Sequence, residues 1–543
     1  MAHSDHSESG SPLVRVTVGR GEPLRNARRP GDADAEGETP PLERGRRILE
    51  AARAAADGID VLEVGSTGIR ALEPLVLVTD EGRTAYHSRP SSERVRALVD
   101  GADSGTIGVD DAAWVVEHDP DRETLPTPPD GPLAVGRRRV LGSCGWADPE
   151  DGSPADGGAA ALARDDPNAA FERLGEVGIL GRGRGDASQD DPVADGLGVA
   201  RETPGDPVVV VNANESDRRN ETDRTLLGGA SAAVLDGALA VAAIVGAEPS
   251  DVVVYTNEVD DLARNRTRRA ARAVAGELGD ETDGGADTPQ VVAGPDRYIA
   301  GEYTMALEAL EGNDRLEARL RPPGPARHGL YGRPTVVHTP RTFAQVRAAL
   351  LDPDAFDADD ADPGTRLFTV TGDVETPATV ELPTGGSLAD VRDAVDAEGG
   401  FKMACVGGRF GGFTRSLDQA ASSLALTNAD LGTEGAVELF DESHCAVATA
   451  GERVRFASEE NCGRCFPCRE GSKQLLDLLR GVYDGDYEDD MIRELARTMG
   501  SSAICHFGRS AARSVGTAVD RFETEFEAHA DGRCPSGACE VTE

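Results

Sequence analysis

The distribution of hydrophobic and polar residues along this chain predicts a mixed α/β protein. Residues 208–211 form a continuous Val run, which is typical of a parallel strand buried on both faces. The Ala-rich segment 229–247 has the length of a buried helix, and the apolar run 252–255 predicts the next strand. Because strand, helix and strand follow one another, we expect an α/β layer with parallel strands in region 136–330.

The pattern changes on both sides of that layer. Residues 41–100 predict a helix, two strands and a second helix, and 331–435 carry short β runs with Gly-rich turns that predict a small α+β domain. Apolar residues at helical spacing predict helices in 436–527. We expect 1–40, which is rich in Ser, Gly, Pro, Asp and Arg, to be disordered, and the acidic, Pro-rich 101–135 to be a linker.

Net charge excludes several classes of partner. The 543 residues include 97 Asp and Glu against 56 Lys and Arg, which gives a formal net charge of −41. Such a field repels nucleic acids and anionic membrane surfaces. The only lysines are Lys402 and Lys473. A Lys-poor, acid-rich surface suits concentrated salt, where charges are strongly screened, so we interpret the chain as halophilic. An ordinary acidic protein with a disordered arm is the alternative.

The N-terminal sequence has neither a basic segment nor an apolar segment of the kind found in signal peptides. Asp236 interrupts the most apolar stretch, which therefore predicts a buried helix and no direct membrane span. Seven of the nine cysteines fall after residue 440, and this clustering indicates metal ligation in a reducing compartment. We expect a cytoplasmic protein, free or peripheral to a membrane complex.

Two groups of cysteines are candidate metal ligands. Cys462, Cys465 and Cys468 follow one another at steps of three, and Cys505 comes 37 residues later. Three local thiolates and one remote thiolate favour a [4Fe-4S] cluster; a zinc site or a redox pair of Cys465 and Cys468 are the alternatives. A second set could bind zinc, the alternative being tail cysteines without function; its members are Cys445, His529, Cys534 and Cys539.

The cluster segment resembles a known family. Residues 460–471, ENCGRCFPCREG, resemble the ESCGxCxPCREG motif of the flavoprotein, NADH-binding subunit of respiratory complex I. The same motif is found in the related diaphorase subunits of NAD-linked hydrogenases and formate dehydrogenases. Further segments resemble the family's fourth-ligand segment, NCGxxDPE-like turn, YICGEETALxxSLEG helix, KPPFPAxxGLxGxPT segment and VGGxxGG turn; they are 504–508, 139–150, 297–312, 321–335 and 406–412.

The resemblance covers roughly residues 135–540 and implies a fold. It implies a Rossmann-like FMN/NADH-binding domain in 136–330, an SLBB-like β-grasp domain in 331–435, a helical iron–sulfur domain in 436–527 and a Cys/His tail in 528–543. That tail resembles the zinc-binding hinge of hydrogenase diaphorase subunits.

The N-terminal region resembles a second family module. Residues 64–76 resemble the thioredoxin-like ferredoxin module, TGCxGxCxxEPLV, that precedes this subunit in hydrogenases. Ser66 and Arg70 stand at its cysteine positions. We therefore expect a degenerate thioredoxin-like module in 41–100 that cannot ligate the [2Fe-2S] cluster.

The resemblance also implies site residues. It places FMN on Gly181, Arg182, Gly183, Asn212 and Asp223. It implies an NAD(H) pocket formed by Glu215, Tyr298 and Glu302, with Glu215 and Glu302 as the catalytic residues, and it makes Gly301 a further cofactor-binding residue.

The sequence departs from the family pattern in this pocket. The Gly-rich loop continues as Asp186-Ala-Ser-Gln-Asp-Asp191, Tyr303 replaces the second Glu of the double-Glu element, and 339–342 is TPRT in place of NVET. Carboxylates repel a phosphate, and each lost charge-assisted contact costs about 1.5–3 kcal/mol. FMN binding is therefore open at this point.

Three functions follow as expectations. The first is an NADH:acceptor oxidoreductase subunit that passes electrons from NADH through FMN to a [4Fe-4S] cluster and an electron-accepting protein in a hetero-oligomer. The second is a flavin-free iron–sulfur electron-transfer or scaffold subunit. The third is a zinc-stabilised regulatory protein without iron.

Overall fold

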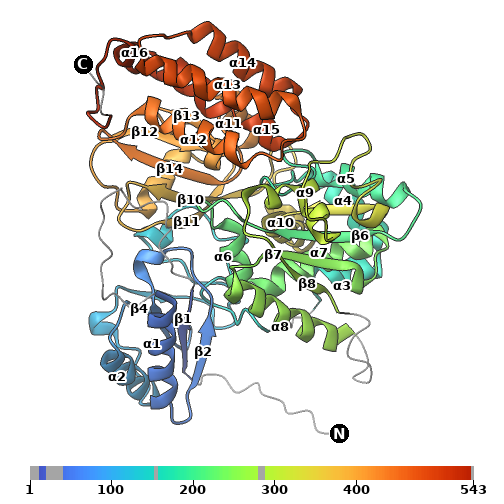
Figure 1. The fold of residues 1–543 in the computed structure, drawn as a ribbon. Helices are drawn as coiled ribbons and strands as arrows, with labels where there is room; N and C mark the ends of the chain where they lie inside the picture. Colours follow the sequence, from blue (N-terminus) through green and yellow to red (C-terminus); the bar gives the residue numbers. More distant parts are fainter. Residues whose placement is uncertain (1–11, 20–40, 152–156, 279–287, 540–543) are drawn as a thin grey trace.

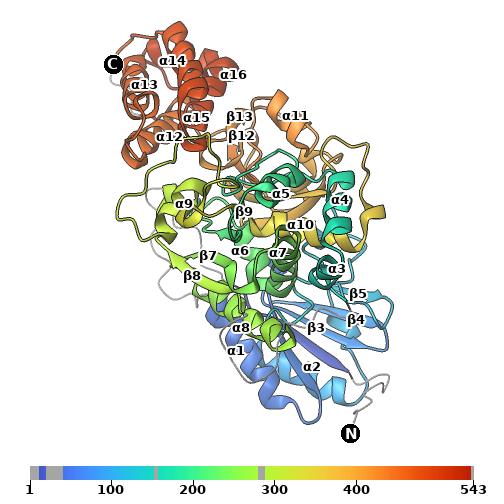
Figure 2. The ribbon, with the colours of Figure 1, turned by 90° about the vertical axis from the view of Figure 1, so that its right-hand side faces the viewer.

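The computed structural model describes residues 12–19, 41–151, 157–278 and 288–539. Three β-sheets and a C-terminal group of helices follow one another in space much as they do along the chain (Figures 1 and 2). A first sheet forms the lower part in Figure 1, a central parallel sheet lies above and beside it, and a third sheet connects the central one to the C-terminal helices. The prediction of a mixed α/β protein is confirmed.

The first sheet has the strand order β2-β1-β3-β4-β5. Its strands are β1 (Leu13–Thr17), β2 (Asp60–Val64), β3 (Leu75–Asp80), β4 (Arg83–Ser88) and β5 (Trp114–Glu117), and its helices are α1 (Pro41–Ala55) and α2 (Ser92–Asp103). β1 lies inside the sheet, parallel to β2 and antiparallel to β3.

Two predictions fail in this sheet. The segment 1–40 contains strand β1, and the predicted linker 101–135 contains strand β5. Both strands are short runs within polar sequence, so pairing with distant strands, and not local pattern, stabilises them. The other parts of segment 1–40, residues 1–11 and 20–40, lie outside the described residues.

The central sheet is wholly parallel, in the order β8-β7-β6-β9. Its strands are β6 (Val208–Ala213), β7 (Val252–Asn257), β8 (Gln290–Gly294) and β9 (Thr335–His338). The helices of this region are α3 (Ala159–Asp165), α4 (Pro167–Val177), α5 (Val193–Glu202), α6 (Thr222–Gly229), α7 (Ser231–Val245), α8 (Asp261–Leu278), α9 (Tyr303–Leu310) and α10 (Pro340–Leu351).

The expected boundary at residue 330 is wrong for β9 and α10. Every residue of β9 is buried, and the strand completes the parallel sheet beside β6. Helix α10 packs on α7 in the same core. A four-residue apolar run carries no local mark of the sheet it joins, so only the tertiary pairing assigns it.

The third sheet is mixed, in the order β11-β10-β14-β12-β13. Its strands are β10 (Thr365–Gly372), β11 (Ala378–Pro383), β12 (Phe401–Val406), β13 (Gly412–Thr414) and β14 (Ala436–Asp441), with helix α11 (Ser423–Asn428) beside them. β14 pairs parallel to β10 and antiparallel to β12 at the centre of the sheet. The sheet therefore reaches past residue 435 into the region predicted to be helical.

Five helices follow and share one hydrophobic core with β12 and β13. They are α12 (Ala446–Glu460), α13 (Phe466–Tyr483), α14 (Asp489–Ser502), α15 (His506–Ser510) and α16 (Arg513–Ala530), the red group at the top of Figure 1. Leu475, Leu476 and Leu479 are buried, as their helical spacing predicts. This group confirms helices from residue 446 onward.

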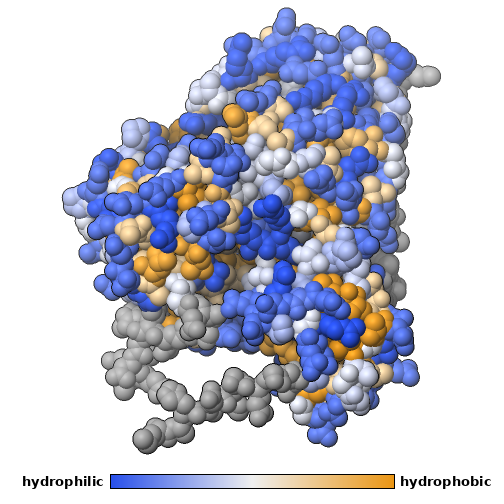
Figure 3. Space-filling view, turned by 180° about the vertical axis from the view of Figure 1, so that it is seen from behind, coloured by the Kyte–Doolittle hydropathy of each residue, from blue (hydrophilic) through white to orange (hydrophobic). Residues whose placement is uncertain are grey.

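One face of the molecule shows the polar surface that the composition predicts. The face in Figure 3 is largely hydrophilic, with apolar patches between the hydrophilic areas. No single helix of the described residues is long and apolar enough to cross a membrane; only α6 and α7 taken together, which meet at 100°, pass that test by length and composition.

The contact between α7 and α10 generates a test of the fold. A Cβ added at Gly237 of α7 would lie 2.1 Å from the Phe343 carbonyl oxygen of α10. We expect Gly237→Ala to lower the free energy of unfolding by about 1–3 kcal/mol, because the helices must separate. The matched control is Gly175→Ala in α4, where nothing lies within 4 Å of the added carbon. That change should stabilise by about 0.5–1 kcal/mol in denaturant melts. Equal effects of both changes would contradict the packing described here.

Candidate functional site

The four cysteines predicted to bind iron come together between three helices. Cys462 follows α12, Cys465 precedes α13, Cys468 lies in its first turn and Cys505 precedes α15. All four pack in or against the C-terminal core. Burial raises the pKa of the Cys505 thiol to about 12, and the charge of Glu302 contributes to that rise. One compact loop and one distant helix start therefore supply four sulfur ligands, of which Cys468 and Cys505 are buried and Cys462 and Cys465 half-buried, and this arrangement fits a [4Fe-4S] cluster.

A glycine gives the remote ligand its position. A Cβ at Gly508 would lie 2.6 Å from the Ala503 Cβ and 3.3 Å from the Cys468 sulfur. Only glycine therefore lets the Cys505 segment approach Cys468 this closely.

A polar hollow of about 370 Å³ lies beyond the carboxyl end of β6, near the edge where parallel strands of α/β proteins bind ligands. Four residues predicted from the sequence line it: Asn212, Glu215, Asp223 and Gly301. The other lining residues are Arg184, Gly185, Asn214, Asp217, Asn220, Thr339, Arg341 and Glu434.

The other predicted residues lie around the hollow and not among its lining residues. The Arg182 guanidinium turns away, where it lies 3.2 Å from Asp362 and donates to the Thr365 carbonyl (3.0 Å). Gly181 packs on Asp186, and Gly183, with φ +83°, packs on Arg341. A left-handed backbone at Gly183 is one that glycine adopts without strain.

Glu302 serves as the N-cap of α9. Its Oε2 accepts hydrogen bonds from the backbone N–H groups of Thr304 (2.9 Å) and Met305 (3.0 Å). The side chain is fully buried, and its Oε1 has no hydrogen-bond partner among the described residues. The charge of this carboxylate acts on the Cys505 thiol, so Glu302 lies near the cluster cysteines.

A buried ion pair crosses the hollow. Arg341 donates to Asp223 through Nε (3.0 Å) and Nη2 (2.6 Å), and its Nη2 lies 3.7 Å from Glu215. Burial favours the neutral form of Arg341, but the charge and hydrogen bond of Asp223, together with the nearby Glu215 and Asp186 charges, outweigh burial and raise the Arg341 pKa. Burial and the Asp223 charge together raise the pKa of Glu215. The Arg341 guanidinium therefore holds the carboxylates of Asp223 and Glu215 close together at a buried position.

Two contacts join the hollow to the cluster segment. His506, next to Cys505, lies 2.6 Å from the Glu434 carboxylate. The Tyr298 ring packs edge-on against Phe507 at 5.7 Å between centroids, and the Arg184 guanidinium lies over the face of that ring at 4.0 Å. Sequence reasoning missed Glu434, which belongs to no motif and enters the site only through folding. It noted position 341 as a departure but not as an ion-pair partner.

The predicted zinc ligands also converge. Cys445, His529, Cys534 and Cys539 place their ligand atoms within 4.8 Å of one another. Cys445 precedes α12, and His529 lies in the last turn of α16 with its Nε2 3.3 Å from the Cys445 sulfur. Three sulfurs and one imidazole nitrogen at such distances match a tetrahedral zinc site.

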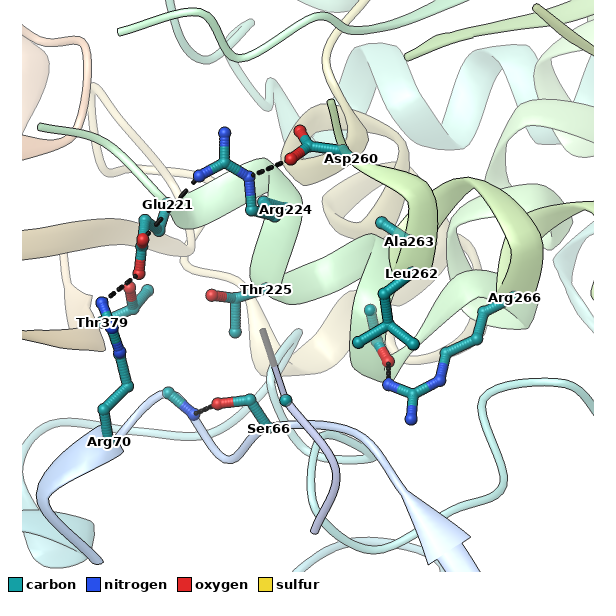
Figure 4. Close-up of a pocket in the computed structure, with 13 residues that line it drawn as sticks. Ser66, Arg70, Glu221, Arg224, Thr225, Asp260, Leu262, Ala263, Arg266 and Thr379 are labelled. Atoms are coloured by element: carbon teal, nitrogen blue, oxygen red, sulfur yellow. Dashed lines mark hydrogen bonds and ion pairs between the residues drawn. The ribbon is translucent and has the colours of Figure 1, made fainter. Parts of the chain in front are cut away.

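Ser66 and Arg70 line a second pocket, of about 500 Å³, between the first sheet and helices α6 and α8 (Figure 4). Arg70 pairs with Glu221 (3.1 Å), and the Ser66 hydroxyl donates to Glu73 (2.8 Å). Figure 4 also shows Arg224 between Glu221 and Asp260. These two side chains thus take part in a hydrogen bond and an ion pair within the protein.

Comparisons with known proteins agree with this geometry. Residues 176–348 match the family model described as Nuo51 FMN-binding domain, and residues 448–529 match the NADH-ubiquinone oxidoreductase-F iron–sulfur binding region. The NADH-quinone oxidoreductase-F protein of Mycobacterium tuberculosis is 33% identical over 348 residues, which cover 60% of this chain and 77% of the relative.

Other relatives extend the similarity to hydrogenases. The HndC subunit of the NADP-reducing hydrogenase of Solidesulfovibrio fructosivorans is 30% identical over 66% of this chain and 76% of its own. A chain of a NAD+-reducing [NiFe]-hydrogenase structure superposes with a TM-score of 0.64 over 97% of this chain and 85% of its own, at 22% identity. That last likeness concerns the fold.

The buried ion pair of the hollow generates a stability prediction. We expect Arg341→Met to lower the free energy of unfolding by about 3–5 kcal/mol, because Asp223 and Glu215 lose their counter-charge in a buried place. Adding Asp223→Asn should restore part of the loss. The control is Arg480→Met, which removes an exposed pair with Asp477 and should cost about 0–1 kcal/mol. Urea melts of the wild type and these variants measure this, and equal losses for the two single changes would contradict it.

Proposed function

Since the chain belongs to the family of the NADH-quinone oxidoreductase-F proteins and their hydrogenase relatives, we propose that it is the subunit through which electrons from NADH enter an oxidoreductase complex. The electrons leave to a partner protein through a [4Fe-4S] cluster bound by Cys462, Cys465, Cys468 and Cys505. The observation that carries this proposal is the convergence of those four cysteines near a polar hollow whose lining residues, all but Glu434, belong to the matched FMN-binding region.

The residues between the two places support electron transfer over a short path. Tyr298 touches Arg184 of the hollow on one side and Phe507, two residues from Cys505, on the other. Glu434 and His506 form a second link. Packed aromatic side chains exclude water there and keep the hollow and the cluster at a constant separation.

Flavin chemistry connects a two-electron donor such as NADH to a one-electron cluster. Asn212, Glu215, Asp223 and Gly301 line the hollow and would contact the ring and its polyol chain. The phosphate end of FMN fits less well, because the Gly-rich loop that would receive it contains the buried Asp186. The residues of this chain would bind and orient the flavin and NADH and exclude water from them.

We further propose zinc at Cys445, His529, Cys534 and Cys539 as a structural clasp that joins the C-terminal tail to α12 and α16. We also propose that the protein works in the cytoplasm at high salt, and the net charge of −41 supports this. We also propose the domain assignments that the resemblance implies: an FMN/NADH-binding domain, a β-grasp domain and a helical iron–sulfur domain. In this proposal β9 and α10 belong to the FMN/NADH-binding domain.

A second candidate is the flavin-free relay. The observation that favours it is that both guanidiniums of the hollow are already engaged, Arg341 by Asp223 and Arg184 by the Tyr298 carbonyl oxygen (2.7 Å). In that case the protein would carry the cluster but accept electrons from another protein and not from NADH.

The two candidates differ in one measurement on protein purified without oxygen in concentrated KCl. After reconstitution with excess flavin, we expect NADH to bleach the cluster absorbance and to produce its EPR signal. Reduction by dithionite but not by NADH would reject the first candidate in favour of the relay. About four iron atoms per chain are expected in either case.

The cluster ligands generate a variant test. Cys505→Ala should abolish the EPR signal and lower bound iron about tenfold, because a remote ligand is lost. Cys405→Ala is the matched control, since Cys405 is an equally buried cysteine of β12 outside the group. Full iron in Cys505→Ala would refute the assignment.

For zinc, we expect about one atom per chain by mass spectrometry. The double change Cys534→Ala and Cys539→Ala should remove it and leave the EPR signal of the cluster intact. Cys144→Ala, again a buried cysteine elsewhere, should change neither metal. Zinc that survives the double change would contradict the site.

A further inference from the structure

The Gly-rich loop and the start of α10 together form an anion cradle. Backbone N–H groups of Arg182, Ser188 and Thr339 point to one place beside the N-terminus of the twelve-residue helix α10. Such an arrangement of N–H groups at the positive end of a helix binds phosphate or carboxylate groups. A phosphate-bearing ligand of this layer would place its phosphate here.

The chain's own Asp186 already fills that cradle. Its carboxylate accepts hydrogen bonds from those three N–H groups at 3.3, 3.1 and 3.4 Å, from the Thr342 hydroxyl at 2.7 Å and from His338 Nδ1 at 2.6 Å. The residue is 1% exposed, and His338 is 2% exposed. Both carboxylate oxygens accept hydrogen bonds, so the Asp186 side chain occupies the cradle as a bound anion would.

The loop leaves no second place for an anion. A Cβ at Gly181 would lie 2.5 Å from Asp186 Oδ1 and 2.3 Å from the Ser188 carbonyl oxygen, so the backbone is packed directly on the carboxylate. A phosphate beside Asp186 would place like charges about 4 Å apart at a buried site.

The charges that line the hollow also disfavour a phosphate. Of the described residues that line it, four are carboxylates: Glu215, Asp217, Asp223 and Glu434. Both lining guanidiniums are engaged within the protein, Arg341 by Asp223 and Arg184 by Tyr298. No cation of this lining is left to neutralise an incoming phosphate.

We propose that Asp186 is a built-in occupant of the phosphate cradle, so that the site takes a flavin without a terminal phosphate in preference to FMN. That a flavin binds here rests on the proposed function. That phosphate is excluded rests on the geometry of the cradle alone. Asp186 is thus a specificity-determining residue that acts by occupying the place of the ligand group it excludes.

Binding of two flavins and of inorganic phosphate tests this. We expect the wild-type protein to quench riboflavin fluorescence with an affinity about a hundredfold higher than for FMN. Asp186→Gly empties the cradle and should reverse the preference, with FMN about tenfold tighter than riboflavin. Inorganic phosphate should bind Asp186→Gly in calorimetry and compete with FMN, and it should not bind the wild type.

The matched control is Asp191→Gly, which removes the same charge from an exposed position of the same loop and should retain the wild-type preference. Should Asp186→Gly fail to fold by circular dichroism, Asp186→Asn keeps the shape without the charge. That variant should narrow the preference for riboflavin about tenfold.

Each outcome decides. Stoichiometric FMN in the wild type, or an unchanged ratio of the two affinities in both Asp186 variants, overturns the inference and leaves the proposed function standing. If neither flavin binds any variant, the flavin-linked function fails, and the inference about the cradle is then decided by the binding of inorganic phosphate alone. Phosphate bound by Asp186→Gly but not by the wild type then supports the occupied cradle, and phosphate bound by neither overturns it.

Discussion

The ion pair between Arg341 and Asp223 joins the elements on which the site depends. Asp223 lies in the first turn of α6, Arg341 lies in the first turn of α10, and the same guanidinium donates to the Glu434 carbonyl oxygen (2.7 Å) in the segment before β14. One buried cation therefore connects the parallel layer to the third sheet. Carboxylates gather at helix starts because the N–H groups there favour negative charge, and the guanidinium supplies the counter-charge at this buried place.

The same principle operates at the Gly-rich loop, with a different outcome. There a buried carboxylate, Asp186, is held by N–H groups, a hydroxyl and His338 instead of a guanidinium. The Gly-rich loop and the start of α10 form the cradle, and the Asp186 side chain takes the place of a phosphate in it. In the first sheet, Ser66 donates a hydrogen bond to Glu73 and Arg70 pairs with Glu221.

The C-terminal half brings together two groups of sulfur-bearing side chains. Cys468 and Cys505 are buried in the core that α12 to α16 share with the third sheet, so that core positions both the cluster ligands and the aromatic contacts around Tyr298. The tail cysteines meet Cys445, at the start of α12, and His529, at the end of α16. The two metal-ligand groups thus lie on one helical group, and the hollow lies where the parallel layer meets the segment before β14.

The sequence alone determined the parts whose chemistry is local. Cysteine spacing predicted both ligand groups, the Val runs predicted the parallel strands, and helical spacing predicted the C-terminal helices. It did not reveal β1, β5 or the sheet to which β9 belongs, because four or five apolar residues gain their stability from distant partners. Nor could it show that Arg182 turns away from the hollow, that Glu302 caps α9, or that Glu434 reaches His506. Those roles depend on side-chain direction and on contacts that include segments tens to hundreds of residues apart. Only the tertiary structure decides such contacts, because burial and charge pairing are properties of the assembled core.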